Sequence, residues 1–282
     1  MDIVVQFEEK PFDRGRFRYA YRGIYIRGPP NKIGQLIVAK TMIAKDMWSP
    51  NDWEESVKIQ KVAQDLAKRF VDYCKQLQFL LLGGSAYEVR FTEVSVVPVI
   101  KALPGSNLLG QHVIVEDYLP GQYKKWVSNY GYISPESEVL PAFAHWSWVH
   151  TRGERMIVDL QGVRRDDLNE YTLTDPVLLS ASVAGGELGC GDTGIECMAM
   201  FFYHHKCGVL CQHLPRPTNQ NVEAIIPELK GKLDIVMTFL KSLQYQTSYA
   251  HEQKLPTEIK IKLVDAFKQI ALGNNHPSCV IS

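Results

Sequence analysis

The first forty residues alternate between apolar and polar positions, with turn-forming residues between the runs. Strands are expected at residues 3–7, 17–26 and 35–40, separated by turns at 11–15 and 28–31. An alternation with a period of two indicates half-buried strands, and Gly, Pro and Asn end such runs. This part of the chain therefore predicts an antiparallel meander.

After residue 49 the apolar residues recur every three or four positions, which predicts one long helix over about 50–79. Its apolar face holds Ile59, Val62, Leu66, Phe70, Tyr73 and Leu77. Two further regions of strand are expected at 87–100 and 112–118, and Pro120-Gly121 then breaks the chain. We interpret the helix as core scaffolding without a chemical role, and the break as a hinge near 115–121.

The second half of the chain predicts a mixture of strands and helices. A helix is expected near 141–145, and an apolar strand over 156–162 carries polar side chains to its exit. Later helices are expected from Pro227 onward and over 257–272. The pattern thus predicts an α+β protein with two lobes and a helical extension. The expected domains are a first lobe at 1–118, a second lobe at 119–215 and the extension at 216–282.

Composition narrows the class of protein. The 282 residues carry 31 basic and 31 acidic side chains, so there is no excess positive charge to favour nucleic acid as a partner. Residues 1–10 do not resemble a secretion signal, and no apolar run approaches the roughly 20 residues that span a membrane. Six cysteines without an export signal indicate thiols or metal ligands in a reducing compartment, so a cytoplasmic location is expected.

A cluster of histidine and cysteine at 201–211 predicts a zinc site. His205, Cys207 and Cys211 supply the imidazole nitrogen and thiolate sulfur that Zn²⁺ prefers in closed tetrahedral sites. A fourth ligand is needed, and His204 or His213 could provide it locally. A structural zinc usually joins distant parts of a chain, so we favour His145. The alternative is that both cysteines are simply small buried apolar residues.

Two acidic residues and an amide indicate phosphoryl-transfer chemistry. Asp159 and Gln161 stand at the exit of the 156–162 strand, and Asp175 follows sixteen positions after Asp159. Their oxygens suit Mg²⁺, and Lys40 ends an apolar strand in the way that places an amine on nucleotide phosphates. Asp175 could equally be a turn-capping residue before a proline.

Two further motifs need an interpretation. The glycines of 189–194 match a dinucleotide-binding pattern, but no apolar strand precedes them, so we expect a loop that orders against substrate. The last four residues, Cys279-Val280-Ile281-Ser282, fit a farnesylation signal. A single lipid without a basic segment beside it would give only weak and reversible membrane contact.

Taken together, these motifs resemble the alpha-kinase family of atypical protein kinases, over roughly residues 8–215. The residues that carry the resemblance are Pro11-Phe12-x-x-Gly15-x-x-Arg18-x-Ala20-Tyr21, Val38-Ala39-Lys40, Val115-Glu116-x-x-x-Pro120-Gly121, Lys125, His145, Asp159-Leu160-Gln161-Gly162-Val163, Leu173-Thr174-Asp175-Pro176, Gly189-x-Gly191-x-x-Gly194 and His205-x-Cys207-x-x-x-Cys211. The resemblance implies a bilobal kinase-like fold, with nucleotide between the lobes and a structural zinc in the second lobe.

The resemblance also implies a role for each site residue. Lys40 would hold the α-phosphate of ATP, Arg18 and Lys125 would assist at the phosphates, and the backbone and carboxylate of Glu116 would receive adenine. Asp159 would accept the proton of the substrate hydroxyl. The implied metal ligands are Gln161 and Asp175 for Mg²⁺, and His145, His205, Cys207 and Cys211 for Zn²⁺.

The chain departs from the family pattern in two places. Residues 164–170 lengthen the spacer between Asp159 and Asp175, and Asp192 stands where asparagine is frequent. Both changes are expected near the position where a substrate peptide would dock. They leave every catalytic group in place.

The motifs and the resemblance thus predict an ATP-dependent serine/threonine protein kinase that acts on a protein substrate, and the resemblance favours threonine. One rival is a pseudokinase or zinc-stapled interaction module that binds nucleotide or a partner without turnover. The other is a zinc hydrolase, which would need an open coordination position and a nearby general base.

Overall fold

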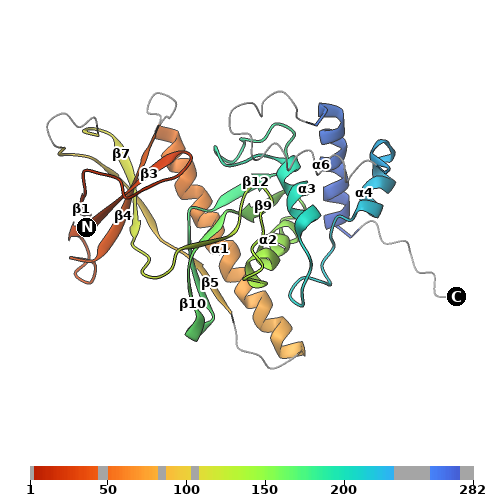
Figure 1. Cartoon of the computed structure of the whole chain (residues 1–282), viewed down its shortest axis with the longest axis horizontal. Coiled ribbons are helices and arrows are strands. Elements are labelled where there is room, and N and C mark those ends of the chain that lie inside the picture. The colour runs from red at the N-terminus through yellow and green to blue at the C-terminus, as the bar shows by residue number, and fades with distance from the viewer. Residues whose placement is uncertain (1–2, 44–49, 82–86, 103–107, 232–254, 274–282) are drawn as a thin grey trace.

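The computed structural model describes residues 3–43, 50–81, 87–102, 108–231 and 255–273, which form two lobes joined by a long helix (Figure 1). Strands β1 to β4, β6 and β7 gather in the first lobe, and most of the later strands and helices gather in the second. The helix α1, Pro50–Leu81, runs from one lobe into the other.

The first lobe is an antiparallel sheet of six strands. Its order is β1 (Val4–Phe7), β3 (Arg18–Arg27), β4 (Leu36–Met42), β7 (His112–Asp117) and β6 (Val94–Pro98), with β2 (Asp13–Arg14) paired to β3. The expected meander is therefore present. Alternate residues face inward, because successive side chains of a strand point to opposite faces. Together with Val99, which follows β6, they form a buried cluster of Tyr21, Tyr25, Ile37, Ala39, Val113 and Val115.

The second lobe holds two smaller sheets. Four strands are ordered β5 (Glu88–Phe91), β11 (Glu170–Thr174), β10 (Leu160–Arg165) and β8 (Lys124–Val127). The remaining pair is β9 (Arg155–Val158) with β12 (Val177–Ser180). Only β5 and β11 run parallel among these pairs.

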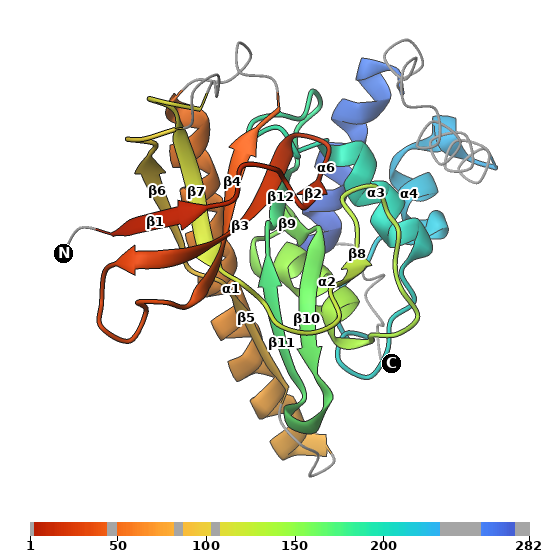
Figure 2. The ribbon, with the colours of Figure 1, turned by 60° about the vertical axis from the view of Figure 1, so that its left-hand side comes forward.

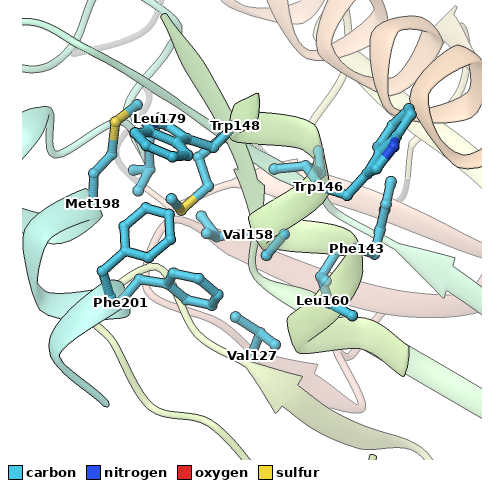
Figure 3. Close-up of a cluster of buried hydrophobic side chains, with 14 of the residues drawn as sticks. Val127, Phe143, Trp146, Trp148, Val158, Leu160, Leu179, Met198 and Phe201 are labelled. Carbon is cyan, nitrogen blue, oxygen red and sulfur yellow. The ribbon is translucent and has the colours of Figure 1, made fainter. Parts of the chain in front are cut away.

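Helices pack on these sheets and build the larger core. They are α2 (Val139–His150), α3 (Ile195–His204), α4 (Asn219–Ile225) and α6 (Thr257–Ala271), with short 3-10 turns η2 (Asp166–Leu168) and η3 (Pro227–Leu229). Figure 3 shows aromatic side chains of α2 and α3, including Trp148 and Phe201, packed with apolar residues of the strands. Both rings are almost fully buried, so this cluster is the rigid base of the second lobe.

The structure corrects two expected strands. Residues 156–162 are not one strand, because β9 ends at Val158 and β10 begins at Leu160 in a different sheet, with Asp159 between them at φ 54°. Residues 87–100 are likewise divided into β5 and β6, which belong to the sheets of different lobes. In both places only one or two polar residues separate the strands, Asp159 in the first and Thr92-Glu93 in the second, which explains why the sequence pattern does not reveal the division.

The predicted long helix lies within the described residues, whereas other predicted segments lie partly or wholly outside them. The helix α1 lies at the predicted place, and its residues Ala63 to Cys74 contribute to the larger core together with Val89 of β5. The helix predicted from Pro227 begins as the 3-10 turn η3, and its continuation lies outside the described residues. The Cys279–Ser282 signal also lies outside them. Across the described residues, no helix is both long and apolar enough to cross a membrane.

Candidate active site and metal centre

A cleft of about 470 Å³ lies between the lobes, and both lobes line it. All seven residues predicted for nucleotide and Mg²⁺ chemistry contribute to its wall: Arg18, Lys40, Glu116, Lys125, Asp159, Gln161 and Asp175. These side chains come from strands of both larger sheets and from the ends of those strands. The fold thus brings together residues from positions 18 to 175 of the chain.

Lys40 is the buried cation of this cleft. Its Nζ lies 2.5 Å from Oε1 of Glu116, 2.6 Å from Oδ2 of Asp175 and 3.1 Å from Oγ1 of Thr174. Burial alone would lower the pKa of Lys40, but the carboxylates of Asp175 and Glu116 outweigh it and raise that pKa. The amine therefore stays charged at neutral pH.

Glu116 is the counter-ion of Lys40, a role that the sequence interpretation did not give it. The residue is 3% exposed, and Oε2 accepts hydrogen bonds from the hydroxyls of Thr92 and Thr174 while Oε1 pairs with Lys40. Both oxygens thus have partners within the protein. The predicted contact of adenine with the backbone and carboxylate of Glu116 stays a prediction.

Asp175 joins the two lobes. Besides Lys40, it accepts a hydrogen bond of 2.9 Å from Nη1 of Arg18, whose Nη2 donates to Oγ of Ser56 in α1. Burial would raise the pKa of Asp175, but Lys40 and Arg18 together hold it below its usual value. Asp175 has a positive φ of 48°, a conformation in which aspartate is enriched among non-glycine residues.

Asp159 has a different electrostatic environment. Lys125 donates to its Oδ1 at 2.7 Å, and the amide nitrogen of Gln161 donates to its Oδ2 at 3.1 Å. Burial raises the pKa of Asp159 and exceeds the opposing effect of Lys125. A carboxylate with a raised pKa in a cleft is suited to accept a proton.

A hairpin explains how Gln161 and Asp175 come together. Strands β10 and β11 are antiparallel, and their register sets Gln161 opposite Thr174, the neighbour of Asp175. The additional residues 164–170 form the other end of this hairpin, around the turn η2. Figure 2 shows that end pointing away from β3 and β4, and none of these residues lines the cleft. The longer spacer therefore extends the hairpin away from the cleft, and the expectation that it lies near a docked substrate peptide stays a prediction.

The loop at 189–194 has a buried carboxylate at its centre. Asp192 is 5% exposed and accepts hydrogen bonds from the backbone nitrogens of Ser180, Leu188 and Gly194 and from the hydroxyl of Ser180. The neighbouring residues Gly189, Cys190 and Gly191 line the cleft. Asp192 thus fixes the shape of the loop and has no direct contact with the cleft.

The second candidate centre is a metal site at the C-terminal end of α3. His145, His205, Cys207 and Cys211 each offer one ligand atom, and these atoms all lie within 4.8 Å of one another. Of the alternatives, His213 instead contacts the hydroxyl of Tyr73. The structure therefore groups the distant His145 of α2 with the three local residues.

The chemistry of these four side chains fits a zinc ion. Nε2 of His145 lies 2.8 Å from the carbonyl oxygen of Pro215, so it carries the proton and leaves Nδ1 facing Cys207. His205 directs Nε2 to Cys211 at 3.4 Å, and burial lowers its pKa so that the ring is neutral. The hydrogen bond from Cys211 and the nearby rings of His145 and His205 hold the pKa of Cys207 far below its usual value, while the pKa of Cys211 is raised. Two neutral imidazoles and a favoured thiolate are the donors that Zn²⁺ requires.

Several residues of the site were not identified from the sequence. Thr92, Thr174 and Gln60 are buried polar side chains around Glu116 and Lys40, and Tyr130 accepts a hydrogen bond from Arg16 across the cleft at 2.6 Å. A threonine or glutamine within an apolar strand or helix is common and does not by itself indicate a functional site. Of these residues, only Thr174 could have been identified from the sequence, because it stands beside Asp175 in one of the motifs that carry the resemblance.

Comparison with known proteins gives a consistent result. Residues 13–211 match the family model described as the alpha-kinase family. The chain is 30% identical to alpha-protein kinase vwkA of Dictyostelium discoideum over 217 residues, which covers 75% of the chain and 31% of that protein. Identity to myosin heavy chain kinase B of the same organism is 26%, covering 80% of the chain and 26% of that kinase. The chain thus spans about a third or less of the length of these relatives.

Solved structures agree with this match. The alpha-kinase domain of myosin heavy chain kinase A in complex with AMP has a TM-score of 0.60 at 26% identity, covering 74% of this chain and 89% of that domain. An inactive form of the kinase A domain complexed with ATP has a TM-score of 0.61 at 25% identity, with coverage of 77% and 90%. The predicted α+β bilobal fold is confirmed by this likeness.

Proposed function

This chain belongs to the alpha-kinase family, and we propose that it is an ATP-dependent protein kinase that phosphorylates serine or threonine, with threonine favoured. The observation that supports this most directly is the convergence of Lys40, Asp159, Gln161 and Asp175 on one interlobe cleft. Phosphoryl transfer depends mainly on positioning and on charge neutralisation, and this set supplies both.

The first lobe supplies the positive charge for the phosphates of ATP. Lys40 binds the α-phosphate, and Arg18 approaches the phosphate chain from the neighbouring strand. Both cations pair with Asp175, so phosphate binding exchanges one set of ion pairs for another. Lys125 is half-exposed beside Asp159 and adds a third cation on the phosphate side.

The second lobe supplies the proton acceptor and the metal ligands. Asp159 orients the substrate hydroxyl and accepts its proton as the hydroxyl oxygen bonds to the γ-phosphorus and the bond to the leaving phosphate breaks. Its raised pKa suits this step. Gln161 and Asp175 would hold Mg²⁺, since the amide nitrogen of Gln161 is turned to Asp159 and its oxygen remains for a cation. Bound Mg²⁺ would supply charge neutralisation at the phosphates.

We further propose that His145, His205, Cys207 and Cys211 hold a structural zinc. Four protein ligands fill a tetrahedral site, which leaves no position for a reactive water and disfavours a zinc hydrolase. The zinc would join α2 to the segment that follows α3, far along the chain from one another. The division at residues 118 and 215 and the lipid on Cys279 remain predictions.

A transfer assay with γ-labelled ATP and a basic protein substrate tests the kinase assignment. Asp159→Asn should reduce incorporation by at least ~10³-fold, because the hydroxyl proton then has no acceptor. Asp166→Asn is the matched control, since that carboxylate is 84% exposed at the far end of the hairpin and should keep wild-type incorporation. Equal incorporation by wild type and Asp159→Asn would refute the assignment. Nucleotide binding without transfer by the wild type would identify a pseudokinase.

A further inference from the structure

The chain crosses between the two larger sheets at Thr92, directly after β5 and shortly before β6. The Thr92 hydroxyl is buried and donates to Oε2 of Glu116 at 2.7 Å. The other oxygen of Glu116 pairs with Lys40 at 2.5 Å. A residue at the crossing is therefore one hydrogen bond away from the counter-ion of the cleft lysine.

The helix α1 fixes the orientation of this threonine. Gln60 is 4% exposed, and its Nε2 donates to the carbonyl oxygen of Thr92 at 2.6 Å and to its Oγ1 at 3.2 Å. Because a carbonyl oxygen can only accept, the amide nitrogen of Gln60 must face Thr92. The hydroxyl accepts from Gln60 and consequently directs its own proton to Glu116.

These contacts connect α1 to Lys40 through Glu116, which accepts from both sides. Gln60 donates to Thr92, Thr92 donates to Glu116, and Glu116 accepts from Lys40. Every member is less than 9% exposed, so water does not readily replace a lost partner. Gln64 also donates to the carbonyl oxygen of Thr92, at 3.0 Å, and provides a comparison on the same helix.

We propose that Thr92 is a positioning residue for Lys40, and that Gln60 of α1 holds its hydroxyl in the required orientation. The inference rests on the proposed function, in which Lys40 binds a phosphate of ATP. Without the Thr92 hydroxyl, the carboxylate of Glu116 loses one of its fixed donors and can rotate about its side-chain bonds. Because Lys40 is paired with Glu116, its position changes as well. The affinity for nucleotide should therefore fall more than the rate of proton transfer to Asp159.

The test compares Thr92→Val, which removes the hydroxyl at nearly constant volume, with Thr92→Ser, which keeps it. Thr92→Val should raise the KM for ATP by about tenfold or more with a smaller change in kcat, the loss expected for one hydrogen bond to a buried charge. Thr92→Ser should stay within about twofold of wild type. Gln60→Met should reproduce the rise in KM, and Gln64→Met should not, because Gln64 contacts only the backbone carbonyl.

Binding and folding are measured on the same proteins. Titration with a fluorescent ATP analogue gives Kd without turnover, and thermal unfolding gives Tm. Equal KM and Kd for the Val and Ser variants of Thr92 would overturn the inference, as would equal rises for Gln60→Met and Gln64→Met that parallel a loss of Tm. A wild type that binds the analogue without phosphate transfer would overturn the proposed function alone, with Kd still deciding the role of Thr92. A wild type that binds no nucleotide would overturn both.

Discussion

Nζ of Lys40 lies 2.6 Å from Oδ2 of Asp175, although 135 positions separate the two residues in the chain. Arg18 binds the other oxygen of the same carboxylate at 2.9 Å. Asp175 thus pairs with two of the three cations that the proposed mechanism assigns to the phosphates. A metal ion that binds Asp175 would release Lys40 and Arg18 for the phosphates, and phosphates that bind Lys40 and Arg18 would release Asp175 for the metal ion. Each ligand would therefore favour the binding of the other.

This relationship predicts that the binding of ATP by Asp175→Asn depends less on Mg²⁺ than it does in wild type. Metal-free ATP should bind about tenfold more tightly than to wild type, ~1.4 kcal/mol, because Asp175 no longer competes for Lys40 and Arg18 or repels the phosphates. Added Mg²⁺ should strengthen binding much less than in wild type, because one metal ligand is lost. Calorimetric titration with ATP in EDTA and in excess Mg²⁺ measures both effects. The idea fails if metal-free ATP binds equally to both proteins.

Asp159→Asn should stabilise the protein at neutral pH while it abolishes transfer. The pKa of Asp159 is raised in the folded state, so its favourable contribution is present below the unfolded pKa and is lost as pH rises through the folded pKa. Asparagine carries no charge and tolerates the positive φ at this position. Tm should therefore rise at pH 7, by roughly 2–4 °C for each kcal/mol gained.

The pH dependence of this gain is the control. The difference in Tm between Asp159→Asn and wild type should shrink toward acid pH, where the wild-type carboxyl is protonated. Asp159→Ala should be equally inactive but less stable than Asp159→Asn, by about 1 kcal/mol, because alanine is disfavoured at positive φ. A Tm difference that is independent of pH would contradict the assigned electrostatics.

Asp175→Asn should show the opposite pH signature. The pKa of Asp175 is lowered in the folded state, so its stabilisation is present above the unfolded pKa of about 3.9 and is lost as pH falls through the folded pKa. The variant should be less stable than wild type at pH 7, and the two unfolding curves should approach each other below about pH 4. Urea unfolding at several pH values measures this. A variant more stable than wild type at pH 7 would exclude a stabilising Lys40–Asp175 pair.

Removal of a zinc ligand should unfold the second lobe at a lower temperature. Cys211→Ala should lose the metal and at least ~3 kcal/mol of stability, which corresponds to a fall in Tm of roughly 6–12 °C. Metal analysis of the wild type should find zinc at about one equivalent, the stoichiometry of a single closed site. His213→Ala is the control, because that histidine lies outside the cluster and contacts Tyr73. Full zinc retention by Cys211→Ala would refute the site.

The turn at the end of the β10–β11 hairpin should be dispensable. Replacement of residues 166–169 by Asn-Gly, which favours a two-residue hairpin turn, keeps the pairing of Arg165 with Glu170 and thus the register at Gln161. Both kcat and the KM for ATP should stay within about twofold of wild type. Deletion of Arg164 alone shifts one strand by one residue and should abolish transfer. Loss of activity in the Asn-Gly variant would show that the turn itself contributes to the site.

The sequence alone determined the elements and the chemical inventory of this protein. Apolar spacing predicted the meander and α1 because helix and strand periodicity is a local property of the chain. The motifs around Lys40, Asp159 and Asp175 identified the family, and the spacing of His205, Cys207 and Cys211 suggested a metal centre. Each of these signals lies within a few consecutive residues.

The tertiary structure decided which buried polar groups pair with one another. Glu116 pairs with Lys40, and Thr92 and Gln60 support Glu116, although no local pattern assigns these roles to them. The break at Asp159 and the grouping of His145 with the cysteines likewise depend on sheet register and helix packing. A buried polar atom must find a partner wherever the fold offers one, and that partner is fixed by contacts between distant segments.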